Sequence, residues 1–199
     1  MVVPTEFGIQ YGTYGALPIA AEALEDGLYR YVESRPCREA WLNLEYRLIE
    51  TLTLVYHGTA VIGRRVKSPD GVQYPVGYGD IVDWPDHRTE RPAAAVQRVA
   101  QRELHTALGI DVQVPPPSFV LTDDTHERGQ NRLVLASLLP LERLVNPAHT
   151  ALRSQRPDRE PLFILNEAFA EDHRERLDGW ARLGLRAVWT TVADKVSDQ

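Results

Sequence analysis

The sequence predicts an α/β fold in which a sheet is flanked by helices and preceded by an N-terminal helical extension. Apolar and β-branched residues fill two runs on either side of the turn at His57 and Gly58, a pattern typical of a β-hairpin. Apolar residues recur at helical spacing over 92–108 and again over 167–185. Because strands and helices alternate along the chain, we expect layers of sheet and helix.

Size and composition limit the classes of protein to which the chain can belong. Its 199 residues fit one domain, or one domain with an added arm. With 43% hydrophobic and 25% charged residues, it is not collagen-like, disulfide-dense or wholly disordered. A formal net charge of −6 argues against general nucleic-acid binding. Cys37 is the single cysteine, so we expect neither an intramolecular disulfide nor a cysteine-based zinc site.

The sequence contains no sign of a membrane segment or a secretion signal. No stretch approaches the roughly 20 apolar residues that span a bilayer. The start, Met1 to Glu6, lacks a basic stretch followed by an apolar run. We therefore expect a cytoplasmic protein with no membrane partner.

The N-terminal part of the chain combines an extension with two strands. The glycine- and tyrosine-rich stretch over 7–15 predicts a loop or an irregular extended arm. A helix is expected over 19–33, ending before Pro36. Strands are expected over 48–56 and 59–66, where apolar β-branched residues are frequent.

The rest of the chain predicts a glycine-flanked extended piece over 77–83 and then a helix over 92–108. Proline suits the first turn of that helix, and Gly109 suits its end. Strands over 119–122 and 133–138 and a charged helix over 167–185 should follow. We divide the chain into an arm and helix over 1–44, a main domain over 45–190 and a loose tail over 191–199.

The end of the helix over 92–108 resembles a known sequence motif. It reads Arg102-Glu103-Leu104-His105-Thr106-Ala107-Leu108-Gly109-Ile110. This is similar to the second half of the Nudix box: Gly, five residues, Glu, seven residues, Arg-Glu-apolar, one residue, Glu-Glu, one residue, Gly-apolar. The order of hairpin, glycine-rich strand, helix and further strands matches as well. The resemblance implies the Nudix, or MutT-like, hydrolase superfamily and its mixed sheet flanked by helices.

The box is degenerate in this sequence. Glu103 stands where the first clustered glutamate belongs, but Thr106 and Ala107 stand where the next two belong. The earlier box glutamate falls at Ala94, so three of four box carboxylates are missing. In the family these glutamates hold Mg²⁺ or Mn²⁺, which need several oxygen ligands. We therefore expect no cofactor in the main hypothesis, and weak metal binding at most.

Carboxylates outside the box leave an alternative open. Asp83 and Asp86 could reach the helix if the loop before it folds back, and would then hold Mg²⁺ or Mn²⁺ together with Glu103. Glu103 would also be the candidate catalytic base. The resemblance implies that Arg102 orients a carboxylate of the site, whereas a structural ion pair is the other interpretation.

The resemblance also implies where a phosphorylated ligand would lie. The strand end carrying Arg64 and Arg65 can face the ligand in such a fold, and arginine suits phosphate. Gly79, Asp80 and Asp83 lie in the stretch that resembles the glycine-rich strand and loop before the box helix. These five residues are the candidate ligand-binding residues.

Three hypotheses about function follow. The first is a Nudix-like protein that binds a nucleotide, another phosphorylated small molecule or a protein partner without efficient hydrolysis. The second is an active metal-dependent hydrolase of nucleoside diphosphate derivatives that uses carboxylates outside the box. The third is a regulatory or structural interaction protein. The tyrosines and leucines of the N-terminal arm also predict self-association into a homodimer or larger homo-oligomer.

Overall fold

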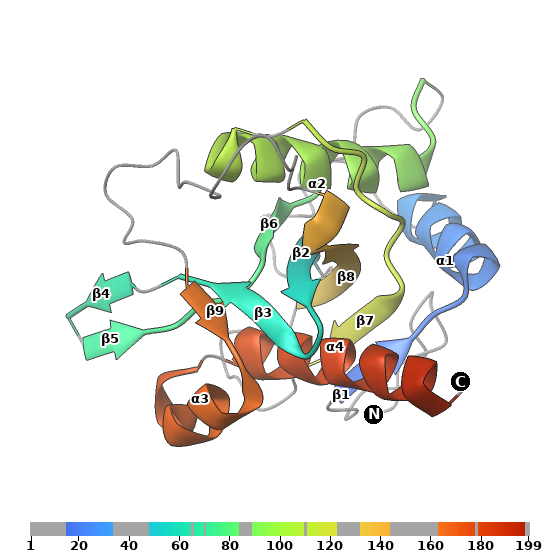
Figure 1. Cartoon of the computed structure of the whole chain (residues 1–199). Coiled ribbons are helices and arrows are strands. Elements are labelled where there is room, and N and C mark those ends of the chain that lie inside the picture. Colours follow the sequence, from blue (N-terminus) through green and yellow to red (C-terminus); the bar gives the residue numbers. More distant parts are fainter. Residues whose placement is uncertain are drawn as a thin grey trace, which may run out of the picture.

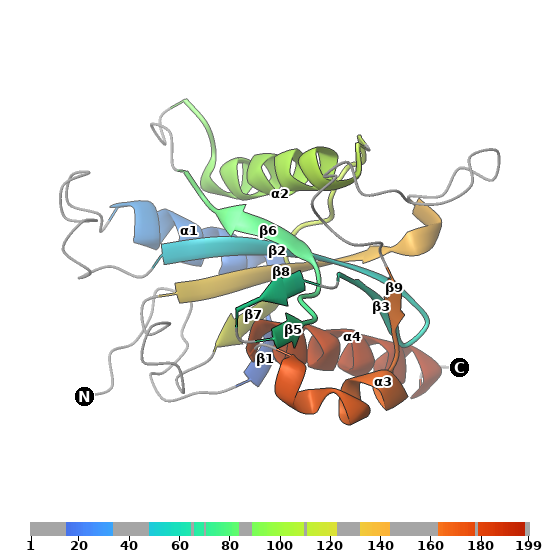
Figure 2. The same cartoon turned by 90° about the vertical axis from the view of Figure 1, so that its left-hand side faces the viewer.

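The computed structural model describes most of the chain. The described residues are 15–33, 48–64, 66–69, 71–83, 89–109, 111–122, 132–143, 163–177 and 179–197. They form a central sheet with helices on both faces (Figures 1 and 2). The α/β class with a mixed sheet flanked by helices is therefore confirmed.

Among the described residues the main sheet has seven strands. Six follow one another in the order β1 (Gly15–Pro18), β7 (Phe119–Thr122), β8 (Arg132–Pro140), β2 (Leu48–His57), β3 (Ala60–Gly63) and β9 (Phe163–Leu165). The seventh, β6 (Tyr78–Ile81), pairs with β2. Strand β2 runs parallel to β8 and antiparallel to both β3 and β6, which makes the sheet mixed.

The sheet forks along one edge of β2. Residues Glu50 to Thr53 of β2 pair with β6, whereas only Tyr56 and His57 at its end pair with β3. Gly79 permits the close pairing with β6, because a Cβ atom there would stand 1.8 Å from the Thr51 carbonyl oxygen. The fork lets β6 lead directly into the helix that covers this part of the sheet.

The helices divide between the two faces of the sheet (Figure 2). Helix α2 (Pro92–Leu108) packs on the first face beside α1 (Ala21–Glu33). Helix α4 (Gly179–Ser197) packs on the second face. The prediction for 92–108 is confirmed at both ends, with proline in the first turn and Gly109 in the left-handed conformation (φ 68°) at the C-cap.

The helix predicted over 167–185 is wrong as a single element. The chain forms α3 (Glu167–Asp172), a 3₁₀ turn (Arg174–Arg176) and only then α4. The break has a physical reason: Leu177 takes an extended conformation and is buried in the core that α4 covers. The loose tail predicted after residue 190 is also corrected, because α4 continues through Ser197 and Val192 still packs against that core.

The strand predicted over 59–66 needs correction. The strand expected over 59–66 is two strands, β3 and β4 (Val66–Ser68), and β4 forms a small separate hairpin with β5 (Gly71–Gln73). The chain leaves the main sheet after β3, where the backbone N–H of Arg64 donates to the carbonyl of Pro75. Of the loop or irregular arm predicted over 7–15, residues 7–14 lie outside the described residues, and Gly15 begins strand β1 of the main sheet.

None of the helices in the described part of the chain is long and apolar enough to cross a membrane.

Candidate functional site

Helix α2 carries two arginines one turn apart, on the edge that overhangs β6 and the segment after it. Arg98 and Arg102 are four residues apart, so their side chains point the same way. Strand β6 pairs with β2 so that Asp80 and Thr51 are direct partners, which places the Asp80 side chain on the α2 face of the sheet. The two arginines therefore meet the acidic residues of β6 and of the segment that follows it.

Arg102 contacts three carboxylates. Its Nη2 donates to Asp80 Oδ2 at 3.1 Å, and its Nη1 lies 3.7 Å from Asp83 Oδ1. Its Nε lies 3.5 Å from Glu103 Oε1. The other oxygen of Asp80 accepts from the backbone N–H of Ile81 at 2.8 Å, which fixes the carboxylate. Both predicted roles of Arg102, orienting a carboxylate and forming a structural ion pair, are compatible with this geometry.

Arg98 extends the same network toward the start of α2. Its Nε and Nη2 donate to the two carboxylate oxygens of Glu90 at 3.0 and 3.1 Å, a bidentate arrangement. Its Nη1 and Nη2 also donate to the Asp83 carboxylate and carbonyl, at 3.3 and 3.1 Å. The hydrogen bond to Glu90 is the main reason that the pKa of Arg98 lies above its ordinary value. Arg98 and Arg102 together hold Asp83 between them.

The described carboxylates do not form a metal-binding cluster. No group of three or more Asp, Glu, His or Cys side chains in the described residues could hold a metal ion. Glu103 is mostly buried, with 19% of its side chain exposed, and its ion-pair partner is Arg102. Along the same face of α2, Thr106 is exposed and Ala107 packs partly against the apolar cluster below. Asp86, the third proposed ligand, lies outside the described residues.

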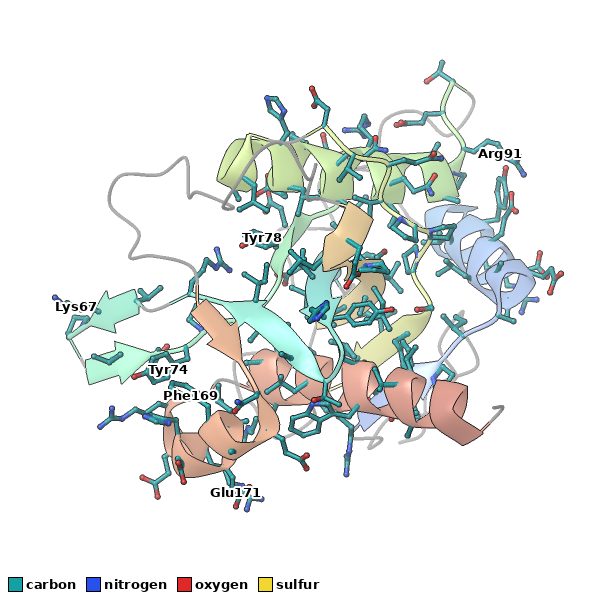
Figure 3. The ribbon with its side chains drawn as sticks, in the orientation of Figure 1. Lys67, Tyr74, Tyr78, Arg91, Phe169 and Glu171 are labelled. Atoms are coloured by element: carbon teal, nitrogen blue, oxygen red, sulfur yellow. The ribbon has the colours of Figure 1, made fainter. Side chains whose placement is uncertain are left out.

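Arg64 lies at the fork between β3 and β6. Its Nη2 donates to the carbonyl of Gly77 at 2.8 Å, and its guanidinium lies 5.1 Å from the centre of the Tyr78 ring. Tyr78 belongs to the apolar cluster that contains Ala100 and Leu104 of α2, and it lies under the C-terminal half of that helix (Figure 3). Arg64 is held against Tyr78 at the same place. A guanidinium fixed in this way suits phosphate recognition. Arg65 lies outside the described residues.

The candidate residues thus fall into two groups. Asp80 and Asp83 form a charged network with Arg102, and Gly79 beside them serves the close approach of β6 to β2. Arg64 stands at the fork with Tyr78. An open hollow of about 430 Å³ lies elsewhere along α2, lined by Gln101, Asp111, Val112 and Gln113. None of the candidate residues that the structure describes is among these four.

Sequence reasoning missed three members of these groups: Arg98, Glu90 and Tyr78. The spacing of Arg98 and Arg102 is a usable signal, because residues four apart on a helix share one face. Glu90 gave no such signal, since its partner is set by how the chain enters α2. Tyr78 stands beside Gly79 in the glycine-rich stretch, where an aromatic ring next to a glycine could have been weighed as a stacking surface.

Comparisons with known proteins identify the fold. No family model matches this sequence, and no curated protein matches it. Among solved structures, Tm1382, a candidate Nudix hydrolase, is 16% identical with a TM-score of 0.62, over 90% of this chain and 89% of that one. A candidate asymmetric diadenosine tetraphosphate hydrolase from Jonesia denitrificans is 14% identical with a TM-score of 0.52, over 75% and 96%. The chain therefore has a Nudix-like fold, as the sequence motif predicted.

Proposed function

We propose that this Nudix-like protein binds a nucleotide or another phosphorylated small molecule and does not hydrolyse it efficiently. The observation that carries the proposal is the pairing of Asp80 and Asp83 with arginines of α2. In the described part of the chain, the carboxylates that could replace the missing box glutamates are already bound to guanidinium groups. A divalent cation would have to displace those arginines to gain ligands.

The second hypothesis, a metal-dependent hydrolase, predicts the opposite behaviour toward metal. It requires Glu103, Asp83 and Asp86 to bind Mg²⁺ or Mn²⁺ together. Because Asp83 accepts hydrogen bonds from Arg98, the cation would first have to break that contact. We therefore regard binding without efficient turnover as the better hypothesis.

Calorimetric titration of Mn²⁺ into metal-free protein separates the two hypotheses. We expect no site tighter than the millimolar range, because Thr106 and Ala107 supply no anionic ligand. The matched control is Glu103→Gln, which removes the one box carboxylate and keeps the side-chain shape. A micromolar site that this substitution abolishes would establish the hydrolase hypothesis instead.

Ligand binding is tested by thermal shift with a panel of nucleoside diphosphate derivatives, with and without EDTA. A ligand at 100 times its Kd should stabilise the protein by about 2.7 kcal/mol. We expect the shift to persist in EDTA and to weaken in Arg64→Lys, which keeps the charge but loses the planar donor geometry. Arg182→Lys is the matched control, because Arg182 is exposed on α4. If no derivative shifts the melting temperature, a protein partner becomes the leading hypothesis.

A further inference from the structure

A stripe of hydroxyl groups crosses the sheet under α2. Thr51 and Thr53 of β2 are 0% exposed, and Ser137 of β8 is 1% exposed. Their side-chain oxygens are fully buried and have no hydrogen-bond partner among the described residues. We call these three residues the hydroxyl seam. Buried hydroxyls without partners are costly, so nearly all such groups in proteins bond to protein or to ordered water.

The strand pattern shows that the hydroxyl seam faces α2. Ile49 and Val55, on the same side of β2 as the two threonines, pack in the clusters that contain α2 residues. Leu52 and Leu54, between them in sequence, pack in the cluster on the α4 face. The three hydroxyls therefore point into the space between the sheet and α2.

The hydroxyl seam separates two apolar clusters. On β2 it lies between Ile49 of one cluster and Val55 of the other. On β8 it lies between Leu135 and Leu139, which divide between the clusters in the same way. The register places Thr53 directly opposite Ser137, so these two hydroxyls stand side by side on one face of neighbouring strands.

The boundary between the two clusters also falls on α2. Val99 is the last helix residue of the first cluster, and Ala100 is the first helix residue of the second. Alanine reaches less far toward the sheet than the Leu104 side chain one turn later. A small polar molecule beside the hydroxyls would satisfy groups that have no partner among the described residues.

We propose that the hydroxyl seam holds an ordered internal water, bonded to Thr53 Oγ1 and Ser137 Oγ, with the Thr51 hydroxyl beside it. Water both donates and accepts hydrogen bonds, as do the hydroxyls, and buried waters ordinarily make two to four such bonds. The site is independent of the proposed ligand. It would join the neighbouring strands β2 and β8 at a point where apolar packing is interrupted.

Thr53→Val tests the proposal, because valine keeps the shape of threonine and removes the hydroxyl. Loss of the water contact should lower the melting temperature by a few degrees, about 2–4 °C. An unchanged or raised melting temperature would overturn the proposal, since removing a dry, unbonded hydroxyl relieves a cost. Val55→Thr is the matched control: it adds a hydroxyl two residues along the same face, inside an apolar cluster, and should lower the melting temperature.

Two further measurements distinguish a bound water from a direct bond between the two hydroxyls. A high-resolution crystal structure of the wild type should show a water about 2.7–3.0 Å from both oxygens, and that of Thr53→Val should not. Hydroxyls bonded only to each other, with no water, would overturn the proposal. The double variant Thr53→Val/Ser137→Ala should also lower the melting temperature by less than the sum of the two single decreases. The reason is that each single substitution already removes the same water.

Discussion

The two faces of the central sheet differ in how they are covered. On the α4 face, one continuous apolar cluster joins α4 to the strands, with Leu183 and Leu185 fully buried in it. On the α2 face, two smaller clusters are separated by buried hydroxyls, and Arg98 and Arg102 pair with acidic residues at the edge. The α4 face therefore mainly stabilises the fold. Polar groups that could bind ligands gather on the α2 face.

The same difference explains why α2 can carry the candidate site without losing its place on the sheet. Its buried side is apolar along its whole length, with Val96, Val99 and Leu104 at or near zero exposure. Its charged edge lies to one side of that stripe, over β6. The helix is therefore anchored by apolar contacts while Arg98 and Arg102 stay partly exposed.

The largest decrease in the free energy of unfolding is expected from Gly79→Ala, which disturbs the sheet where β6 pairs with β2. An alanine Cβ would stand 1.8 Å from the carbonyl oxygen of Thr51 and 2.8 Å from its carbonyl carbon. Because both are backbone atoms, the pairing of β6 must break. We expect urea unfolding to show a loss on the order of 4 kcal/mol or more, or no folded protein at all.

Gly15→Ala is the matched control for that substitution. Gly15 is also a strand glycine, but a Cβ atom there meets nothing within 4 Å. The free energy of unfolding of the Gly15→Ala protein should differ from that of wild type by less than about 1 kcal/mol. Equal losses in the two variants would mean that the close approach at Gly79 does not govern the stability of this face.

The second prediction compares one buried leucine from each face. Leu183→Ala on α4 and Leu104→Ala on α2 should each lower the free energy of unfolding by about 2–5 kcal/mol, because both side chains are fully buried. Only Leu104→Ala should also weaken the proposed nucleotide binding, since Leu104 shares its apolar cluster with Tyr78, against which Arg64 lies. Isothermal titration at a temperature where both variants are folded measures this. Weaker binding in Leu183→Ala would contradict the division between the faces.

Local signals in the sequence were sufficient for the elements that lie on the α2 face. The helix over 92–108 was predicted at both ends, because proline at its start, Gly109 at its end and a regular apolar spacing agree with one another. The division of the C-terminal region into two helices was not predicted, because an apolar stripe over 167–185 fits one helix as well as two. Burial of Leu177 against the sheet decides that question, and it depends on tertiary structure.

The candidate site was predicted less completely than the fold. Arg102, Asp80 and Asp83 were chosen from a motif and a neighbouring stretch, and the structure brings them into one ion-pair network. That network also contains Arg98 and Glu90, whose pairing depends on how the segment before α2 approaches the helix. Sequence spacing alone does not encode that approach. The sequence therefore identified the acidic residues and Arg102, but not Arg98, the second guanidinium that holds Asp83.

A third prediction concerns the two arginines of α2. Arg98→Gln should lower the free energy of unfolding by about 1 kcal/mol, because Arg98 binds Glu90 in a bidentate manner and Glu90 is only 22% exposed. Arg102→Gln should cost less, about 0.5 kcal/mol, since its contacts are longer and more exposed. Urea unfolding at 50 mM and 500 mM NaCl measures both, and salt should reduce the smaller loss more. A larger loss for Arg102→Gln would indicate that Arg102 is the main support of β6.

The smallest effect is expected at the far end of the sheet, where Glu142 pairs with His57. The pKa of Glu142 lies below its ordinary value, first because its carboxylate accepts a hydrogen bond from its own backbone N–H and then because of His57. Folding therefore favours the charged carboxylate. The resulting stability is present above the unfolded glutamate pKa of about 4.3 and is lost as the pH falls through the folded pKa. Both side chains are well exposed, so Glu142→Gln should lower the melting temperature by only about 1 °C at pH 6. This difference should shrink below pH 4, as wild type loses its charge, and a difference that stays constant from pH 6 to pH 3 would contradict the assignment.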